Sequence, residues 1–194
     1  FSQIEPKLLF ACDGYHYAGN ALDRLNVVAE LAGRLPSLQA VVIIPYLNAE
    51  PDLSAFAGAV HFGHAIATSP PVESFTRVSF NDPLYILFSS GTTGAPKCIV
   101  HGVGGTTLQH VKELRLQSDV KRDDALFFFT TCGWMMWNWL VGALSAGATI
   151  LLFDGFPMYK REDLLLKITN RENITLLGVS AKYIDSLRKT KKNY

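Results

Sequence analysis

Hydrophobic runs bounded by glycine, proline or polar residues alternate along this chain with segments whose apolar residues recur every three or four positions. The runs are typical of buried β-strands, and the spaced pattern is typical of helices that pack on a sheet. Strands alternating with helices predict an α/β fold with a doubly wound, mostly parallel sheet flanked by helices. The predicted strands are KLLFAC (7–12), QAVVIIPYL (39–47), LYILF (84–88), ALFFFT (125–130), TILLF (149–153) and ITLLGVS (174–180).

The first 47 residues predict a βαβ unit. Asn20 has the residue type of a helix N-cap, with Asp23 three residues later, and Pro36 marks the end of that helix. A strand, a helix and a second strand in this order imply a parallel pair with a right-handed crossover. The predicted apolar face of the helix consists of Leu22, Leu25, Val28, Ala32 and Leu35.

Residues 48–82 contain several prolines and many small residues, so we expect a linker-like segment with one short helix near residues 53–56. This segment also contains His61 and His64. Two histidines without a third ligand nearby do not define a metal site, and we expect them to be ordinary loop residues.

The pattern of strands and helices resumes after residue 82. CIVH (98–101) predicts a further strand, and Thr106 or Thr107 opens a helix. The apolar side of that helix is formed by Leu108, Val111 and Leu114. Three more helices are predicted at 135–146 (MMWNWLVGALSA), 163–168 and 181–189 (AKYIDSLRK).

Residues 125–153 carry no charge, which raises the alternative of a membrane span. Three glycines interrupt this run, and Asp154-Gly155 closes it as a turn would. A buried helix followed by a buried parallel strand has the same hydropathy. The surrounding alternation of strands and helices favours this soluble interpretation.

Composition narrows the class of protein. The chain has 194 residues, 48% of them hydrophobic, which is enough for a sizeable core. Its formal net charge of +1 provides no electrostatic case for binding nucleic acid or an acidic membrane. Cys12, Cys98 and Cys132 are far apart and form no CxxC pair, so neither a disulfide framework nor a zinc site is indicated. A reducing, cytoplasmic setting fits this cysteine usage best.

The stretch FSSGTTGAPK (88–97) has the composition of a phosphate-binding loop. Its glycines allow backbone N–H groups to approach phosphate oxygens, its hydroxyls add donors, and its lysine adds a positive charge. The spacing differs from the Gly-x-x-x-x-Gly-Lys-Ser/Thr loop of nucleotide triphosphatases. The candidate phosphate-binding residues are Ser89, Ser90, Gly91, Thr92, Thr93, Gly94 and Lys97.

SSGTTGAPK, with a strand before it and IVH after it, resembles the phosphate-binding signature of the AMP-forming acyl-CoA synthetases, which are adenylate-forming enzymes. Cys98 departs from that signature, because many members have glycine there. The segments PKLLFACDGYHYAG, TTCGWMMWNWLVGALSAGATILLFDG and SAKYIDSL look most like the acetoacetate–CoA ligase branch. The resemblance covers essentially the whole chain and implies a partial AMP-binding (N-terminal) domain over 1–194, with a phosphate-loop α/β subdomain over 83–194.

The resemblance implies ATP-dependent activation of acetoacetate to acetoacetyl-CoA through an acyl-adenylate, with release of AMP and pyrophosphate. The implied small molecules are acetoacetate, ATP, Mg²⁺ and coenzyme A. The candidate phosphate-binding residues would surround the β- and γ-phosphates, and Trp134, Trp137 and Asn138 would shape the acyl pocket. His101 and His110 follow the loop, and His101 is expected to be an ordinary histidine at a strand end.

Several parts of the family pattern are absent from these residues. Neither Tyr-Gly-x-Thr-Glu nor Thr-Gly-Asp occurs, and the domain that carries the adenylation lysine is not included. We therefore expect a fragment that has no catalytic residue of its own and no ligase activity alone, and that exposes apolar surface through which it can self-associate. The alternatives are a fragment of an acetyl- or propionyl-CoA synthetase, and a non-catalytic phosphate-binding module.

Overall fold

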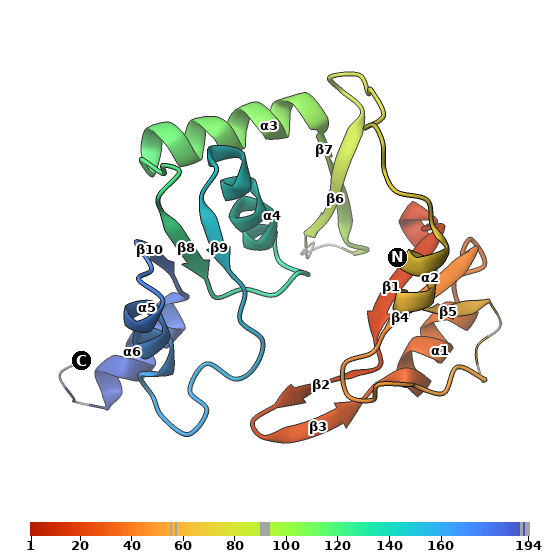
Figure 1. Cartoon of the computed structure of the whole chain (residues 1–194), viewed down its shortest axis with the longest axis horizontal. Helices are drawn as coiled ribbons and strands as arrows, with labels where there is room; N and C mark the ends of the chain where they lie inside the picture. The colour runs from red at the N-terminus through yellow and green to blue at the C-terminus, as the bar shows by residue number, and fades with distance from the viewer. Residues whose placement is uncertain (55, 57, 90–93, 191, 193–194) are drawn as a thin grey trace. The chain divides into compact units, whose positions relative to one another are not determined.

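The computed structural model describes residues 1–54, 56, 58–89, 94–190 and 192 (Figure 1). The chain divides into two compact units, Phe1–Thr76 and Arg77–Tyr194. Each unit contains its own three-stranded parallel sheet with helices packed against it. The predicted α/β class with parallel sheets flanked by helices is therefore confirmed.

The first unit is built on a parallel sheet of order β1-β4-β5. After a short 3₁₀ turn (Ser2–Ile4), its elements are β1 (Leu8–Cys12), β2 (Gly14–Tyr17), β3 (Asn20–Asp23), α1 (Leu25–Gly33), β4 (Ala40–Ile44), β5 (Ala59–His61) and α2 (Phe62–Thr68). Val28 of α1 packs on Val41 and Ile43 of β4, which confirms the βαβ unit. The expectation that β1 is fully buried is wrong, because Leu8 and Phe10 are 54% and 56% exposed.

The predicted helix start at Asn20 is also wrong, because Asn20–Asp23 forms β3, which pairs antiparallel with β2. The two residues between these strands, Ala18 and Gly19, both have positive φ (50° and 89°). Such a turn matches the twist of a two-stranded hairpin. The helix begins at Leu25 instead, where the Leu25 N–H donates to Asp23 Oδ1 at 3.0 Å, and it ends at Gly33.

The segment 48–82 contains more regular structure than its composition predicts. β5 adds to the edge of β4, and α2 follows it directly. Leu53, Ser54 and Phe56, the described residues of the short helix expected near 53–56, are not helical; the Phe56 N–H donates to the Leu53 carbonyl in a turn, and Asp52 Oδ1 accepts from the Ser54 N–H at 2.9 Å. β5 was missed because three residues are too short to display a strand pattern.

The second unit begins with an antiparallel hairpin and continues into a parallel sheet of order β10-β8-β9. The hairpin consists of β6 (Pro83–Ser89) and β7 (Lys97–Gly102). The remaining elements are α3 (Val103–Lys112) with a π-helical turn (Glu113–Gln117), β8 (Ala125–Phe128), α4 (Met135–Gly142) with a 3₁₀ turn (Ala143–Ala146), β9 (Thr149–Leu151), α5 (Leu164–Arg171), β10 (Leu176–Gly178) and α6 (Ala181–Lys189).

The central strand β8 contributes to both cores of this unit. Leu126 packs with Leu114 of the π-helical turn after α3 and with Leu140 of α4 on one face, and Phe127 packs with α5 and α6 on the other. Successive side chains of a strand point to opposite faces, which explains this division. The uncharged run 125–153 thus folds as strand, helix and strand, as predicted. Within the described residues, no helix is long and apolar enough to cross a membrane.

Helix α3 begins at Val103, three or four residues before the predicted start at Thr106 or Thr107. The ring of Phe80 lies against Gly104 where a side chain would otherwise stand, and the Gly104 N–H donates to the Phe80 carbonyl at 2.8 Å. Leu114 is fully buried, but Leu108 is 62% exposed and does not belong to the predicted apolar face.

Candidate functional site

The phosphate-loop sequence connects the two strands of the β6–β7 hairpin. Ser89 ends β6 and lies directly opposite Lys97, the first residue of β7. Residues opposite each other in a strand pair project to the same face, so the Ser89 hydroxyl and the Lys97 ammonium share one face of the hairpin. Gly94 has a φ of 140°, which favours glycine. Ser90, Gly91, Thr92 and Thr93 lie outside the described residues.

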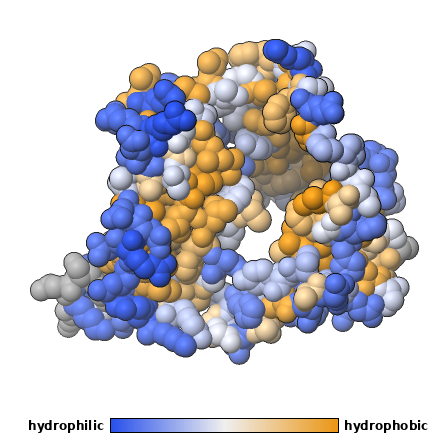
Figure 2. All heavy atoms as spheres, in the orientation of Figure 1, coloured by the Kyte–Doolittle hydropathy of each residue, from blue (hydrophilic) through white to orange (hydrophobic). Residues whose placement is uncertain are grey.

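The hairpin exposes apolar side chains along its length. Figure 2 shows hydrophobic surface where Figure 1 draws β6 and β7. Cys98, which departs from the family signature, is exposed and lies opposite Phe88. The exposed apolar residues of the two strands are Leu84, Ile86, Phe88, Ile99 and Val100. The expected exposure of apolar surface is therefore confirmed.

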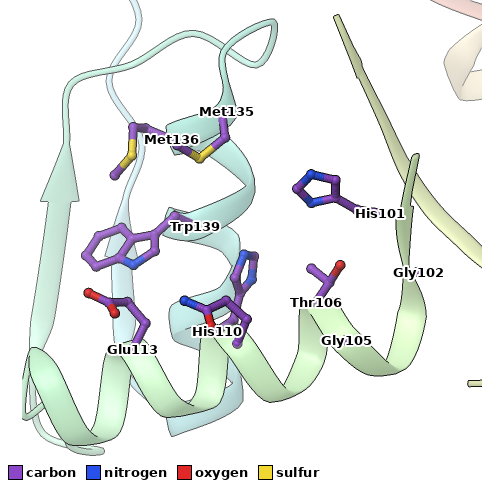
Figure 3. A pocket seen from close by; sticks show the side chains of 10 residues that line it. His101, Gly102, Gly105, Thr106, His110, Glu113, Met135, Met136 and Trp139 are labelled. Atoms are coloured by element: carbon purple, nitrogen blue, oxygen red, sulfur yellow. The ribbon is translucent and has the colours of Figure 1, made fainter. Parts of the chain in front are cut away.

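A cavity of about 490 Å³ lies between the end of β7 and the helices α3 and α4 (Figure 3). The α3 residues that line it recur at helical spacing and form one face of that helix. The β7 and α4 side chains close the other sides. The lining residues are His101 and Gly102 from β7, Gly105, Thr106, Gln109, His110 and Glu113 from the α3 helix and its π-helical turn, and Met135, Met136 and Trp139 from α4.

The cavity has an apolar end and a polar end. β7 runs from Lys97, at the phosphate loop, to Gly102, where α3 follows directly, so α3 lies at the end of the hairpin opposite the loop. Figure 3 shows Met135 and Met136 at the end of the cavity remote from α3. The α3 helix and its π-helical turn form the floor and carry Thr106, Gln109, His110 and Glu113, while His101 comes from β7.

His110 is the histidine of this floor. Its ring packs closely against α4, since a Cβ placed on Gly142 would lie 2.6 Å from His110 Nδ1. Burial lowers the pKa of His110, and the nearby charge of His101 lowers it further. A depressed pKa keeps the imidazole neutral at neutral pH, with one nitrogen as a donor and the other as an acceptor.

The three residues predicted for an acyl pocket are separated by the geometry of α4. Trp134 precedes the helix and is 67% exposed. Trp137 lines a second cavity of about 400 Å³. Asn138 is half-buried and lines neither cavity. Sequence reasoning missed Met135, Met136 and Trp139; helical spacing would have placed these together on a face different from that of Trp137.

The second cavity lies where the parallel strands β8 and β9 end. Open α/β sheets commonly bind ligands beyond the carboxyl ends of their strands. Phe128 at the end of β8 contacts Trp139 edge-on, with 6.0 Å between ring centroids. Thr130, Thr131, Cys132 and Asp154 supply the polar part of the lining.

Asp13 is a buried carboxylate in the first unit that the sequence reasoning overlooked. Its two oxygens accept hydrogen bonds of 2.8–3.1 Å from the backbone N–H groups of Tyr46, Leu47 and Asn48, and a fourth from the Asn48 side chain at 3.2 Å. Burial alone would raise the pKa of Asp13, but these hydrogen bonds outweigh it and lower the pKa below its ordinary value. Asp13 therefore fixes the loop after β4.

Within the described residues, no group of three histidine, cysteine or acidic side chains could hold a metal ion. His61 and His64 are not the loop residues that the sequence predicted, because His61 ends β5 and His64 lies in α2.

Comparison with known proteins identifies the class. The family model for AMP-binding enzymes matches residues 1–194, so the chain belongs to the AMP-binding enzyme family. An acetoacetyl-coenzyme A synthetase of Rhizobium meliloti (strain 1021) is 46% identical over 97% of this chain and 29% of its own length, and an acetoacetyl-CoA synthetase of Mus musculus is 42% identical over 96% and 29%.

A malonamoyl-CoA synthetase of Penicillium aethiopicum is 41% identical over 97% of this chain and 28% of its own length. Among solved structures, the acetoacetyl-CoA synthetase from Streptomyces lividans matches with a TM-score of 0.90 and 41% identity, over 98% of this chain and 29% of that one. The chain thus spans 28–29% of the length of the relatives it matches.

Proposed function

We propose that this chain supplies the phosphate loop and part of the acid pocket of an ATP-dependent acetoacetate–CoA ligase. The observation that carries the proposal is the phosphate-loop sequence between Ser89 and Lys97, on a hairpin whose other end borders the cavity. In this proposal, a polyphosphate site and a pocket for a small acid belong to the same hairpin. Enzymes of this family use ATP and coenzyme A.

The proposed reaction has two steps. A carboxylate oxygen of the acid attacks the α-phosphorus of ATP, and the bond to pyrophosphate breaks with its electron pair leaving on pyrophosphate. The thiolate of coenzyme A then attacks the acyl carbon, and AMP leaves. Mg²⁺ enters with ATP as part of the substrate and shares the phosphate charge.

The role of this chain in the first step is to bind and orient the phosphates. Lys97 adds a positive charge beside the oxygens of the β- and γ-phosphates, where negative charge builds up as pyrophosphate leaves. The backbone N–H groups and hydroxyls of the loop supply further donors. The full set proposed for this role is Ser89, Ser90, Gly91, Thr92, Thr93, Gly94 and Lys97.

The acyl groups in the names of the relatives indicate which class of acid the pocket would accept. Acetoacetyl and malonamoyl groups both carry a carbonyl at their third carbon. The apolar side chains of Met135 and Met136 and the polar floor on α3 suit an acid of that kind better than a plain alkyl acid. Trp134, Trp137 and Asn138 stay proposed for the acyl pocket of the whole enzyme, although none of them lines this cavity.

A chimera tests the proposal. This chain would replace the matched segment of the Rhizobium meliloti relative, and pyrophosphate release with Mg-ATP would be measured with acetoacetate, acetate and propionate. Release of pyrophosphate with acetoacetate supports the proposal. Release with acetate or propionate alone would indicate that the chain comes from an acetyl- or propionyl-CoA synthetase. A folded chimera that binds ATP but releases no pyrophosphate with any acid would identify a non-catalytic phosphate-binding module.

Three further proposals concern the isolated chain. We expect no pyrophosphate release from it, because it corresponds to only 28–29% of the length of the relatives it matches. We expect it to self-associate through the apolar surface of β6 and β7, which sedimentation velocity would detect. We also propose a cytoplasmic location, based on the exposed cysteines Cys12, Cys98 and Cys132, which form no disulfide with one another.

A further inference from the structure

The polar floor of the cavity is not required by adenylation itself. Activation of an acid needs its carboxylate to meet the α-phosphate, and the rest of the acid needs only to fit. His101 and His110 nevertheless project into this cavity, opposite the apolar side chains of Met135, Met136 and Trp139 (Figure 3). These imidazoles are therefore available to contact a polar group of a bound acid.

We propose that His110 is a specificity-determining residue that selects 3-oxo acids, by donating a hydrogen bond from its imidazole N–H to the keto oxygen of the substrate. This inference rests on the proposed function and deepens it. It assigns to one side chain of α3 the distinction between acetoacetate and an alkyl acid of the same length.

The direction of the cavity supports this role. The phosphate loop lies at one end of β7, and α3 lies at the other. An acid whose carboxylate points toward the loop passes the methionines and presents its far carbons to the α3 floor. Glu113 lines that floor one turn beyond His110, and its negative charge disfavours a substrate carboxylate there. The substrate is thus oriented with its keto group toward His110.

The hydrogen-bonding state of His110 also fits. Among the described residues, no side chain or carbonyl forms a hydrogen bond with its ring, so its N–H is open to the cavity. Its ring is held by close packing against Gly142. Since burial and the neighbouring His101 keep the imidazole neutral, it offers a donor for a carbonyl rather than a positive charge for a carboxylate.

Butyrate is the matched comparison, because it replaces the keto group of acetoacetate by a methylene group. A hydrogen bond between neutral groups, together with the cost of leaving one partner unpaired, corresponds to about a tenfold difference in kcat/KM between the two acids. The ratio of kcat/KM for acetoacetate to that for butyrate is therefore the quantity to measure. Any loss of folded enzyme cancels in this ratio.

The experiment compares three variants with the parent chimera described above. His110→Phe keeps a flat ring but removes the donor, and we expect the ratio to fall by about tenfold. His110→Gln keeps an N–H donor, and we expect it to retain most of the parent ratio. His101→Phe tests the neighbouring imidazole, and we expect it to change kcat/KM for both acids equally.

The outcomes separate the two proposals. A parent chimera that releases no pyrophosphate with any acid refutes the proposed function. A parent that prefers acetoacetate, with a ratio changed by less than about twofold in His110→Phe, refutes the role of His110 alone. The inference is also wrong if the acetoacetate-to-butyrate ratio falls in His101→Phe and not in His110→Phe, because the hydrogen-bond donor would then be His101 of β7.

Discussion

The contact between His110 on α3 and Gly142 on α4 leads to a quantitative prediction. A methyl group added by Gly142→Ala would lie 2.6 Å from Nδ1, 3.1 Å from Cγ and 3.2 Å from Cβ of His110. Cβ and Cγ are close to the α3 backbone, so turning the ring cannot relieve all three contacts. Either the helices separate or the His110 side chain leaves its position.

The size of the effect follows from two opposing terms. Overpacking of this kind costs about 1–3 kcal/mol. Replacing glycine by alanine in a helix returns about 1 kcal/mol, and Gly142 has a helical φ of −55° that alanine accepts. We therefore expect Gly142→Ala to lower the free energy of unfolding by about 1 kcal/mol.

Gly105 on α3 provides the matched control. A Cβ placed there meets nothing within 4 Å. Gly105→Ala should consequently raise the free energy of unfolding by about 1 kcal/mol, since only the helix term remains. Urea unfolding of the 194-residue chain, followed by circular dichroism, would measure both variants.

The difference between the two variants is the test, and it should be about 2 kcal/mol. Equal stability of Gly142→Ala and Gly105→Ala would show that α3 and α4 do not approach each other as described. In the chimera, Gly142→Ala should also reduce the preference for acetoacetate over butyrate, because it displaces His110. An unchanged preference in a destabilised Gly142→Ala variant would contradict the link between this contact and the cavity.

Three further predictions concern other parts of the molecule. Asp13→Ala should lower the free energy of unfolding by about 3 kcal/mol, because it leaves the N–H groups of the loop after β4 without their acceptor. Since the pKa of Asp13 is lowered in the folded state, the contribution of its ionised carboxylate to stability is complete above about pH 4. That contribution is lost as the pH falls through the folded-state pKa. In acid unfolding, the stability of Asp13→Asn should therefore depend less on pH than that of the parent chain. Leu126→Ala should lower the free energy of unfolding by about 3 kcal/mol in thermal or urea unfolding, because Leu126 of β8 is fully buried against the π-helical turn after α3 and against α4. A loss below about 1 kcal/mol would contradict that packing. Lys97→Ala in the chimera should reduce the rate of pyrophosphate release by at least about tenfold. The control Lys189→Ala, on the exposed surface of α6, should leave this rate unchanged. Equal rates of release by the two variants would show that Lys97 does not belong to the phosphate site.

The sequence alone determined the class of fold and the phosphate-loop hypothesis. Long apolar runs such as ALFFFT, and helices with a clear start such as the one that begins after Asp163, are set by neighbouring residues in the sequence. The order of residues in SSGTTGAPK likewise carries its information within one short segment. Both kinds of feature are local, and local features can be recognised without knowing which other segments lie nearby.

Only the tertiary structure decided the features that depend on distant residues. Asn20 resembles a helix cap, but its segment becomes a strand because Gly14–Tyr17 is available to pair with it. Likewise, β5 is a strand because β4 offers it an edge.

The cavity between β7, α3 and α4 also depends on residues that are distant in the sequence. His110 and Met136 are 26 positions apart in the sequence and line the same cavity only because α3 and α4 pack on one face of the β8 sheet. The helical phase of α4 then decides that Met135, Met136 and Trp139 face α3 while Trp137 lines the other cavity. Sequence patterns report which residues are apolar, and the packing of whole elements determines which of them meet.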